Sequence, residues 1–169
     1  MLAHLVSVRE YIARSGNLHA MTEFHGVLFV CRANICRSPM AESMFGVLAR
    51  ERGLSLRVGS AGVEARPGFD MAPGTRMVLE ELGFPAGEHR SRAVSGGLLE
   101  DYDLVLTMTR RHSEVLRGVA SGAEVMTLPE FAGDRAEPDI SDPYRLTVHA
   151  YRATARRMLG YVEAALDRI

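Results

Sequence analysis

The sequence contains no lysine and no tryptophan, only two cysteines, and no long hydrophobic run. All 20 basic residues are therefore arginines, and against 21 acidic residues they leave a net charge of −1. This balance provides no overall positive charge for binding nucleic acid. No apolar stretch approaches the roughly 20 residues needed to cross a bilayer, which excludes a membrane-spanning protein. We therefore expect neither nucleic acid nor membrane as a partner.

The two cysteines, Cys31 and Cys36, lie close together in the sequence. One pair is too few for the disulfide framework of a small secreted protein or for a four-cysteine zinc site. None of the 6 histidines shows the spacing of metal ligands. The sequence thus predicts no metal and no cofactor, and a cytoplasmic protein whose thiols are free for chemistry.

The chain has 169 residues, of which 47% are hydrophobic and 24% charged, as in one ordinary folded domain. We expect a single domain over residues 26–169, preceded by an N-terminal extension of unknown role over residues 1–25. The extension carries a weak amphipathic helical pattern, made by Leu2, Leu5, Val8 and Ile12. Alternatively, the protein begins at Met21.

Strand and helix patterns alternate after residue 26. Apolar runs predict strands near residues 27–30, 54–58, 104–106 and 125–127. Helical periodicity predicts helices over residues 39–52, 75–82 and 146–166, and another from near residue 110. This alternation predicts an α/β fold, a three-layer sandwich in which helices flank a four-stranded parallel sheet. A ligand would bind beyond the carboxyl ends of the strands.

The first predicted strand runs directly into the segment Cys31-Arg32-Ala33-Asn34-Ile35-Cys36-Arg37-Ser38-Pro39. Proline suits the first turn of a helix, so this segment is predicted to be a loop between a strand and a helix. Backbone N–H groups and the helix dipole bind a tetrahedral oxyanion at such a place, and they favour a thiolate at Cys31. Arg37 can bind two phosphate oxygens with its planar guanidinium. From position alone, Cys31 could equally be an inert buried cysteine.

With these residues the chain resembles the bacterial type of the low-molecular-weight protein tyrosine phosphatase family. The match runs from Val27 to Glu42 and continues, in the order of the family, through Ser60-Ala61-Gly62, His89-Arg90-Ser91-Arg92, Asp103 to Met108, and Asp142-Pro143-Tyr144. The resemblance implies a phosphate-binding loop after the first strand. It also implies an enzyme that hydrolyses phosphotyrosine in proteins through a cysteinyl-phosphate intermediate.

The resemblance further implies three catalytic residues: Cys31 as nucleophile, Arg37 as the phosphate-binding cation and Asp142 as general acid and base. The loop amides from Arg32 to Ser38, including Ala33, Asn34, Ile35 and Cys36, would bind the phosphate. Without the resemblance, Asp134 and Asp139 would compete with Asp142, because all three lie in one polar segment.

Further residues match supporting positions of the family. Ser38 would donate a hydrogen bond to the Cys31 sulfur, and Asn34 would hold the loop in a left-handed conformation. Ser60 and His89 would brace Asn34, although His89 alone could be an ordinary loop histidine.

Arg66 and Tyr144 are expected to line the substrate cleft. Cys36 is a candidate redox partner, since a nearby thiol can capture an oxidised Cys31 as a disulfide. It could instead be a small packed residue.

The sequence departs from the family at Arg32, Ala33, Val63 and Arg66, which affects substrate preference more than catalysis. An arsenate reductase that uses an external small thiol is one alternative. A phosphoarginine phosphatase is another, but such relatives typically have threonine where Ile35 stands. A non-catalytic phosphoprotein-binding module would be expected to lack Cys31, Arg37 or Asp142.

Overall fold

The computed structural model describes residues 24–120 and 122–169. The expectations about the N-terminal helical pattern and about Met21 therefore lie outside the described residues. Within the described residues, ten elements follow one another: β1 (Gly26–Cys31), α2 (Arg37–Glu51), β2 (Arg57–Gly62), α3 (Pro73–Glu81), α4 (Gly96–Leu99), β3 (Leu104–Thr107), α5 (Arg110–Arg117), β4 (Glu124–Thr127), α6 (Leu128–Ala132) and α7 (Val148–Leu166).

The four strands form one parallel sheet in the order β2-β1-β3-β4. β1 lies between two neighbours and all six of its residues are buried, which explains its uninterrupted apolar sequence. The chain passes from β1 to β2 on one side, and it later forms β3 on the other side of β1. The carboxyl end of β1 is therefore the point where such sheets bind ligands.

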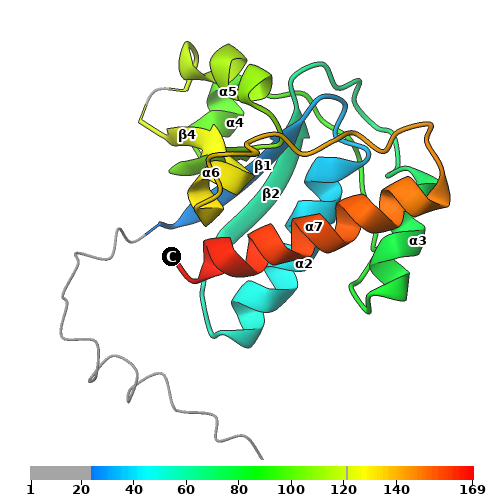
Figure 1. Cartoon of the computed structure of the whole chain (residues 1–169). Helices are drawn as coiled ribbons and strands as arrows, with labels where there is room; N and C mark the ends of the chain where they lie inside the picture. Colours follow the sequence, from blue (N-terminus) through cyan, green and yellow to red (C-terminus); the bar gives the residue numbers. More distant parts are fainter. Residues whose placement is uncertain (1–23, 121) are drawn as a thin grey trace, which may run out of the picture.

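Helices cover both faces of this sheet, as Figure 1 shows. α2, α3, α6 and α7 pack on one face around a large core that includes Phe29, Phe45 and Met158. α4 and α5 contribute Leu99 and Leu116 to a smaller core on the other face. The predicted three-layer α/β sandwich with a four-stranded parallel sheet is confirmed. Among the described helices, none has a stretch of the length and hydrophobicity needed to traverse a bilayer.

The predicted second strand is wrong in position, because β2 occupies Arg57–Gly62 rather than residues 54–58. The small residues at its end looked like a turn, yet they pair with β1 up to Gly62 opposite Cys31. A Cβ atom on Gly62 would lie 2.6 Å from the Arg32 carbonyl oxygen and 2.8 Å from the Asn34 nitrogen. Glycine is thus needed here for the close approach of the β1–α2 loop, and not for a turn.

Two short helices were absent from the sequence prediction. α4 has four residues and α6 has five, which is too short for helical periodicity to be visible. The residues at the start of α6 nevertheless form a capping box, which is a local signal for a helix N-terminus. The Thr127 hydroxyl accepts from the Glu130 backbone N–H, and the Glu130 carboxylate accepts from that of Thr127.

Candidate active site

The β1–α2 loop curls at the carboxyl edge of the sheet, between Cys31 at the end of β1 and Arg37 at the start of α2. Cys36 precedes the helix and makes no side-chain hydrogen bond to the first turn. The N–H groups at the start of α2 are therefore not occupied by a capping side chain. Together with the helix dipole, they form a place where an anion is stabilised.

Asn34 holds the loop in shape from its centre. Its φ of 56° is left-handed, a conformation that asparagine tolerates better than most residues. Its side-chain amide donates to the hydroxyls of Ser38 (2.9 Å) and Ser60 (2.8 Å), and its oxygen accepts from the Arg92 backbone N–H (2.9 Å). The His89 ring Nε2 lies 2.7 Å from the Asn34 carbonyl oxygen. The structure thus brings together the supporting residues predicted from sequence.

Replacing Asn34 should separate its two contributions to stability. Asn34→Ala removes the side-chain hydrogen bonds of a fully buried residue and also strains the left-handed backbone. We expect its free energy of unfolding to fall by about 2–4 kcal/mol. Asn34→Gly loses the same hydrogen bonds without the strain, so it should lose less. Urea denaturation of both variants measures this, and an equal loss would show that the backbone conformation carries no cost.

The Cys31 sulfur lies 3.0 Å from the Ser38 hydroxyl, and both groups are buried. The Ser38 oxygen accepts from the Asn34 amide and also lies 3.2 Å from the Ala61 carbonyl oxygen. Its single proton therefore has two acceptors within reach, the sulfur and this carbonyl. A hydroxyl so placed can stabilise negative charge on the sulfur.

Arg37 links the loop to a distant part of the chain. Its guanidinium, which is almost fully buried, donates from Nη1 to the Ile140 carbonyl (2.9 Å) and from Nη2 to the Asp142 carboxylate (2.8 Å). Its Nε is buried and has no acceptor among the described residues. That N–H is consequently available to an oxygen of a phosphate, which fits the fork geometry of arginine.

Only one of the three competing aspartates reaches the cavity. Asp142 lines it and is held by Arg37 and by the Tyr144 backbone N–H at 3.2 Å. Asp139 accepts from the Arg110 backbone N–H at the start of α5, and Asp134 accepts from the Tyr161 hydroxyl. Asp134 and Asp139, the two alternatives to Asp142, therefore lie outside the cavity.

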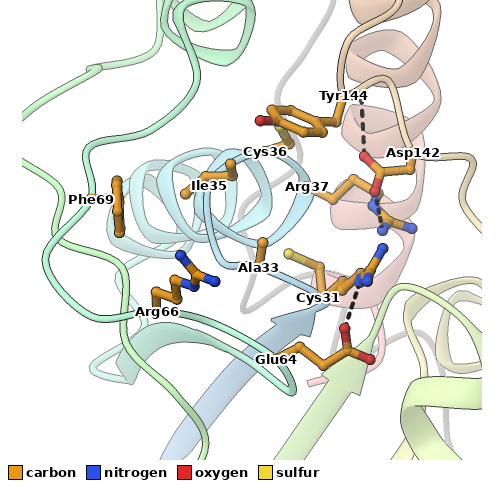
Figure 2. Close-up of a pocket in the computed structure, with 11 residues that line it drawn as sticks. Cys31, Ala33, Ile35, Cys36, Arg37, Glu64, Arg66, Phe69, Asp142 and Tyr144 are labelled. Atoms are coloured by element: carbon orange, nitrogen blue, oxygen red, sulfur yellow. Dashed lines mark hydrogen bonds and ion pairs between the residues drawn. The ribbon is translucent and has the colours of Figure 1, made fainter.

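The cavity has a volume of about 450 Å³ and opens above Cys31 (Figure 2). Arg66 and Tyr144, which the sequence analysis expects at the substrate cleft, both line this cavity. The sequence reading missed Phe69 and Glu64, which line it as well. Phe69 is 57% exposed and supplies an aromatic wall opposite Tyr144. An exposed aromatic residue in a loop was the available signal for it.

His112 is a second residue that the sequence reading missed. It is 7% exposed, and its Nδ1 has no hydrogen-bond partner among the described residues. Burial and the nearby Arg37 charge lower the pKa of its imidazole to about 4, although Asp142, Asp139 and Glu64 act in the opposite direction. The imidazole is therefore neutral at physiological pH and adds no charge beside the site.

This neutral histidine predicts a pH dependence of stability. Since its pKa falls from 6.5 to about 4 on folding, the unfolded chain binds the proton more tightly. The free energy of unfolding therefore has its full value above pH 6.5. It falls as the pH drops from 6.5 through 4, by roughly 3 kcal/mol in all. In His112→Gln the free energy of unfolding should vary less over this window. An unchanged pH profile would remove His112 from the titration.

Cys36 also faces the cavity, and its sulfur lies 3.5 Å from the Tyr151 hydroxyl. Burial raises the pKa of this thiol to about 11, so it is protonated at neutral pH. Neither cysteine is in a disulfide. The structure thus places two free sulfurs in one loop, in different environments.

A parallel α/β sheet whose first loop joins a cysteine, an arginine and a helix N-terminus defines a class of phosphate-handling protein. A family model described as low molecular weight phosphotyrosine protein phosphatase matches residues 26–168. The chain belongs to this family, which confirms the resemblance noted in the sequence. It is an enzyme, a cysteine-dependent hydrolase that acts on phosphoproteins.

Individual relatives agree with this assignment. A protein-arginine-phosphatase of Bacillus subtilis is 35% identical over 130 residues, covering 76% of this chain and 85% of the relative. The low molecular weight protein-tyrosine-phosphatase Wzb of Salmonella typhi is 35% identical over 132 residues, covering 77% and 84%. The crystal structure of a low molecular weight protein tyrosine phosphatase from T. tengcongensis superimposes with a TM-score of 0.78 at 33% identity, covering 86% and 99%.

Proposed function

We propose that this enzyme hydrolyses phosphotyrosine in proteins with Cys31, Arg37 and Asp142 as its catalytic residues. The observation that carries the proposal is that Asp142, from a distant part of the chain, meets Cys31 and Arg37 of the β1–α2 loop at one cavity with aromatic walls. The loop amides from Arg32 to Ser38 bind the phosphate. No metal enters the proposed chemistry, and a reducing cytoplasm suits it because Cys31 must stay reduced.

In the first step the Cys31 sulfur attacks phosphorus in line with the leaving group. The sulfur–phosphorus bond forms as the bond to the phenolic oxygen breaks, and protonated Asp142 gives its proton to that oxygen. Arg37 turns from its ion pair with Asp142 to the equatorial oxygens. This movement frees the carboxyl group and stabilises the charge of the transition state.

In the second step water attacks the cysteinyl phosphate. Asp142, now ionised, takes a proton from the water as the new oxygen–phosphorus bond forms and the sulfur–phosphorus bond breaks. The products are inorganic phosphate and the regenerated Cys31 sulfur. The Ser38 hydroxyl, 3.0 Å from this sulfur, stabilises it as it leaves.

The walls of the cavity support an aromatic substrate. Ile35, Phe69 and Tyr144 present apolar surface around the entrance. A flat ring gains from this contact, whereas a phosphoserine is too short to reach both walls and the loop. Isoleucine at position 35 also offers no hydrogen bond to a phosphoarginine guanidinium.

A substrate panel tests the proposed function. We expect phosphotyrosine peptides to be hydrolysed with a kcat/KM at least about 10-fold above that for phosphoserine and phosphoarginine peptides of the same sequence, since one apolar contact in a pocket gives about this factor. Arsenate with glutathione serves as the test of reductase activity. A higher kcat/KM for phosphoarginine than for phosphotyrosine would make phosphoarginine the substrate. Turnover of arsenate with no hydrolysis of the phosphopeptides would make the protein an arsenate reductase.

We also propose that Cys36 protects Cys31 from irreversible oxidation. Peroxide oxidises the Cys31 sulfur to a sulfenic acid, and the Cys36 thiol displaces water from it to form a disulfide. A dithiol reductant then restores both thiols. After peroxide and reductant, the parent protein should recover most of its activity and Cys36→Ala little of it. Equal recovery would leave Cys36 as a packing residue beside Tyr151.

A further inference from the structure

One wall of the cleft is held in place by Ser91, a residue with no role in the chemistry described above. Its hydroxyl donates to the Arg66 carbonyl (2.6 Å) and accepts from the Phe69 backbone N–H (2.9 Å). Its own backbone pairs with Phe69 (2.7 Å) and with Gly68 (2.8 Å). Ser91 is 2% exposed, so these hydrogen bonds are partly shielded from water. The segment that carries Arg66 and Phe69 is therefore fixed before a substrate arrives.

The carboxylates around the cleft are paired with arginines, but one arginine of the cleft has no carboxylate partner in the described residues. The two carboxylates already have partners: Glu64 pairs with Arg32 at 2.7 Å, and Asp142 pairs with Arg37 at 2.8 Å. Arg66 has no carboxylate within ion-pair distance in residues 24–120 and 122–169. Figure 2 shows its guanidinium turned into the cleft beside Phe69. The cleft thus keeps an arginine whose charge no carboxylate of the described residues neutralises.

The opposite wall of the cleft, formed by Tyr144, also has an arginine beside it. Arg145 stacks over the Tyr144 ring, with its guanidinium carbon 5.4 Å from the ring centre. It also lacks a carboxylate partner within the described part of the chain. Its φ of 62° is left-handed, an uncommon conformation for arginine that turns the chain just after Tyr144. Each aromatic wall therefore has an arginine beside it.

We infer that Arg66 is a specificity residue that binds a carboxylate next to the phosphotyrosine, so that the preferred substrate is an acidic phosphotyrosine segment. This inference rests on the proposed function, because a ring bound between Phe69 and Tyr144 places the flanking substrate residues at the rim. A planar guanidinium binds a carboxylate there with two hydrogen bonds and repels a basic side chain. Arg145 adds to the same preference from the other wall.

Three phosphotyrosine peptides that differ only in their flanking residues test the inference: acidic, neutral and basic. The quantity to compare is the ratio of kcat/KM for the acidic peptide to that for the neutral one. We expect Arg66→Ala to lower this ratio about two- to fivefold, the effect of one exposed ion pair. Arg66→Glu should lower it further and raise the ratio for the basic peptide. Added salt should reduce the ratio more in the parent than in Arg66→Ala, where Arg145 alone still favours the acidic peptide.

The matched control is Arg50→Ala, which removes the same charge at the far end of α2 and should leave the ratio as in the parent. Ser91→Ala, which frees the wall, should lower the ratio with Arg66 intact, and Ser91→Thr should restore it. Ratios that stay the same in Arg66→Ala and Arg66→Glu would overturn the role of Arg66. Hydrolysis of the neutral peptide by the parent tests the proposed function separately, since that reaction does not need Arg66 to find a carboxylate.

Discussion

Cys31→Ser should reduce kcat for aryl phosphates by at least about 10⁴-fold, which is the largest effect that we expect from any single substitution. The serine hydroxyl is a far weaker nucleophile, and among the described residues no general base hydrogen-bonds to this position. The hydrogen-bond partner of the Cys31 sulfur is the Ser38 hydroxyl at 3.0 Å, and a hydroxyl cannot act as the base that removes the proton. Steady-state kinetics with an aryl phosphate measures the loss.

The loss in Cys31→Ser must come from chemistry and not from folding. Inorganic phosphate should therefore still bind to the variant, because the loop amides and Arg37 remain, and the midpoint of urea unfolding should stay close to that of the parent. Cys36→Ser is the matched control, since it makes the same change at the other end of the loop and should retain measurable turnover. Turnover of Cys31→Ser near the parent value would exclude Cys31 as the nucleophile.

Asp142→Asn should lower kcat by about 10²–10⁴-fold for esters of weakly acidic phenols, the usual range for losing a general acid. For phenols that leave readily as anions, the loss in the first step should be much smaller, because such leaving groups need no proton. A plot of log kcat/KM against the pKa of the leaving phenol should therefore be steep in the variant and shallow in the parent.

Asp139→Asn is the matched control for this substitution. Its side chain accepts a hydrogen bond from the Arg110 backbone N–H, which an asparagine oxygen can also accept. We expect its kcat to stay within a few-fold of the parent value. A flat leaving-group plot in Asp142→Asn, or a steep one in Asp139→Asn, would assign the proton transfer to a different residue.

The sequence predicted the β1–α2 loop well because local signals coincide there. An apolar strand, a proline at a helix start and a cysteine–arginine pair all indicate one short structure, and none of them depends on distant contacts. The choice among Asp134, Asp139 and Asp142 was different. It depends on where a polar segment folds back over the loop, and local residue types do not encode that path.

The errors have a common physical cause. β2 was misplaced because Ser60, Ala61 and Gly62 look like turn residues, whereas all three pair with β1 and the small size of Gly62 serves the close packing of the loop against the strand end. Phe69 and His112 were missed because their importance comes from tertiary position. The first is exposed at a cavity wall, and the second is buried beside a charge. An aromatic residue in a loop is a signal for Phe69, but the sequence alone encodes neither its place at the cavity wall nor the burial of His112.

The covalent intermediate on Cys31 is the central claim, and rapid acid quenching of the parent enzyme during turnover of an aryl phosphate tests it most directly. Mass spectrometry of the proteolysed protein then locates the phosphoryl group. We expect it on the peptide that contains Cys31, with the modification on that sulfur and absent from Cys36. A phosphoryl group on another residue, or none at all while a burst of phenol equal to the enzyme concentration is released, would contradict the mechanism.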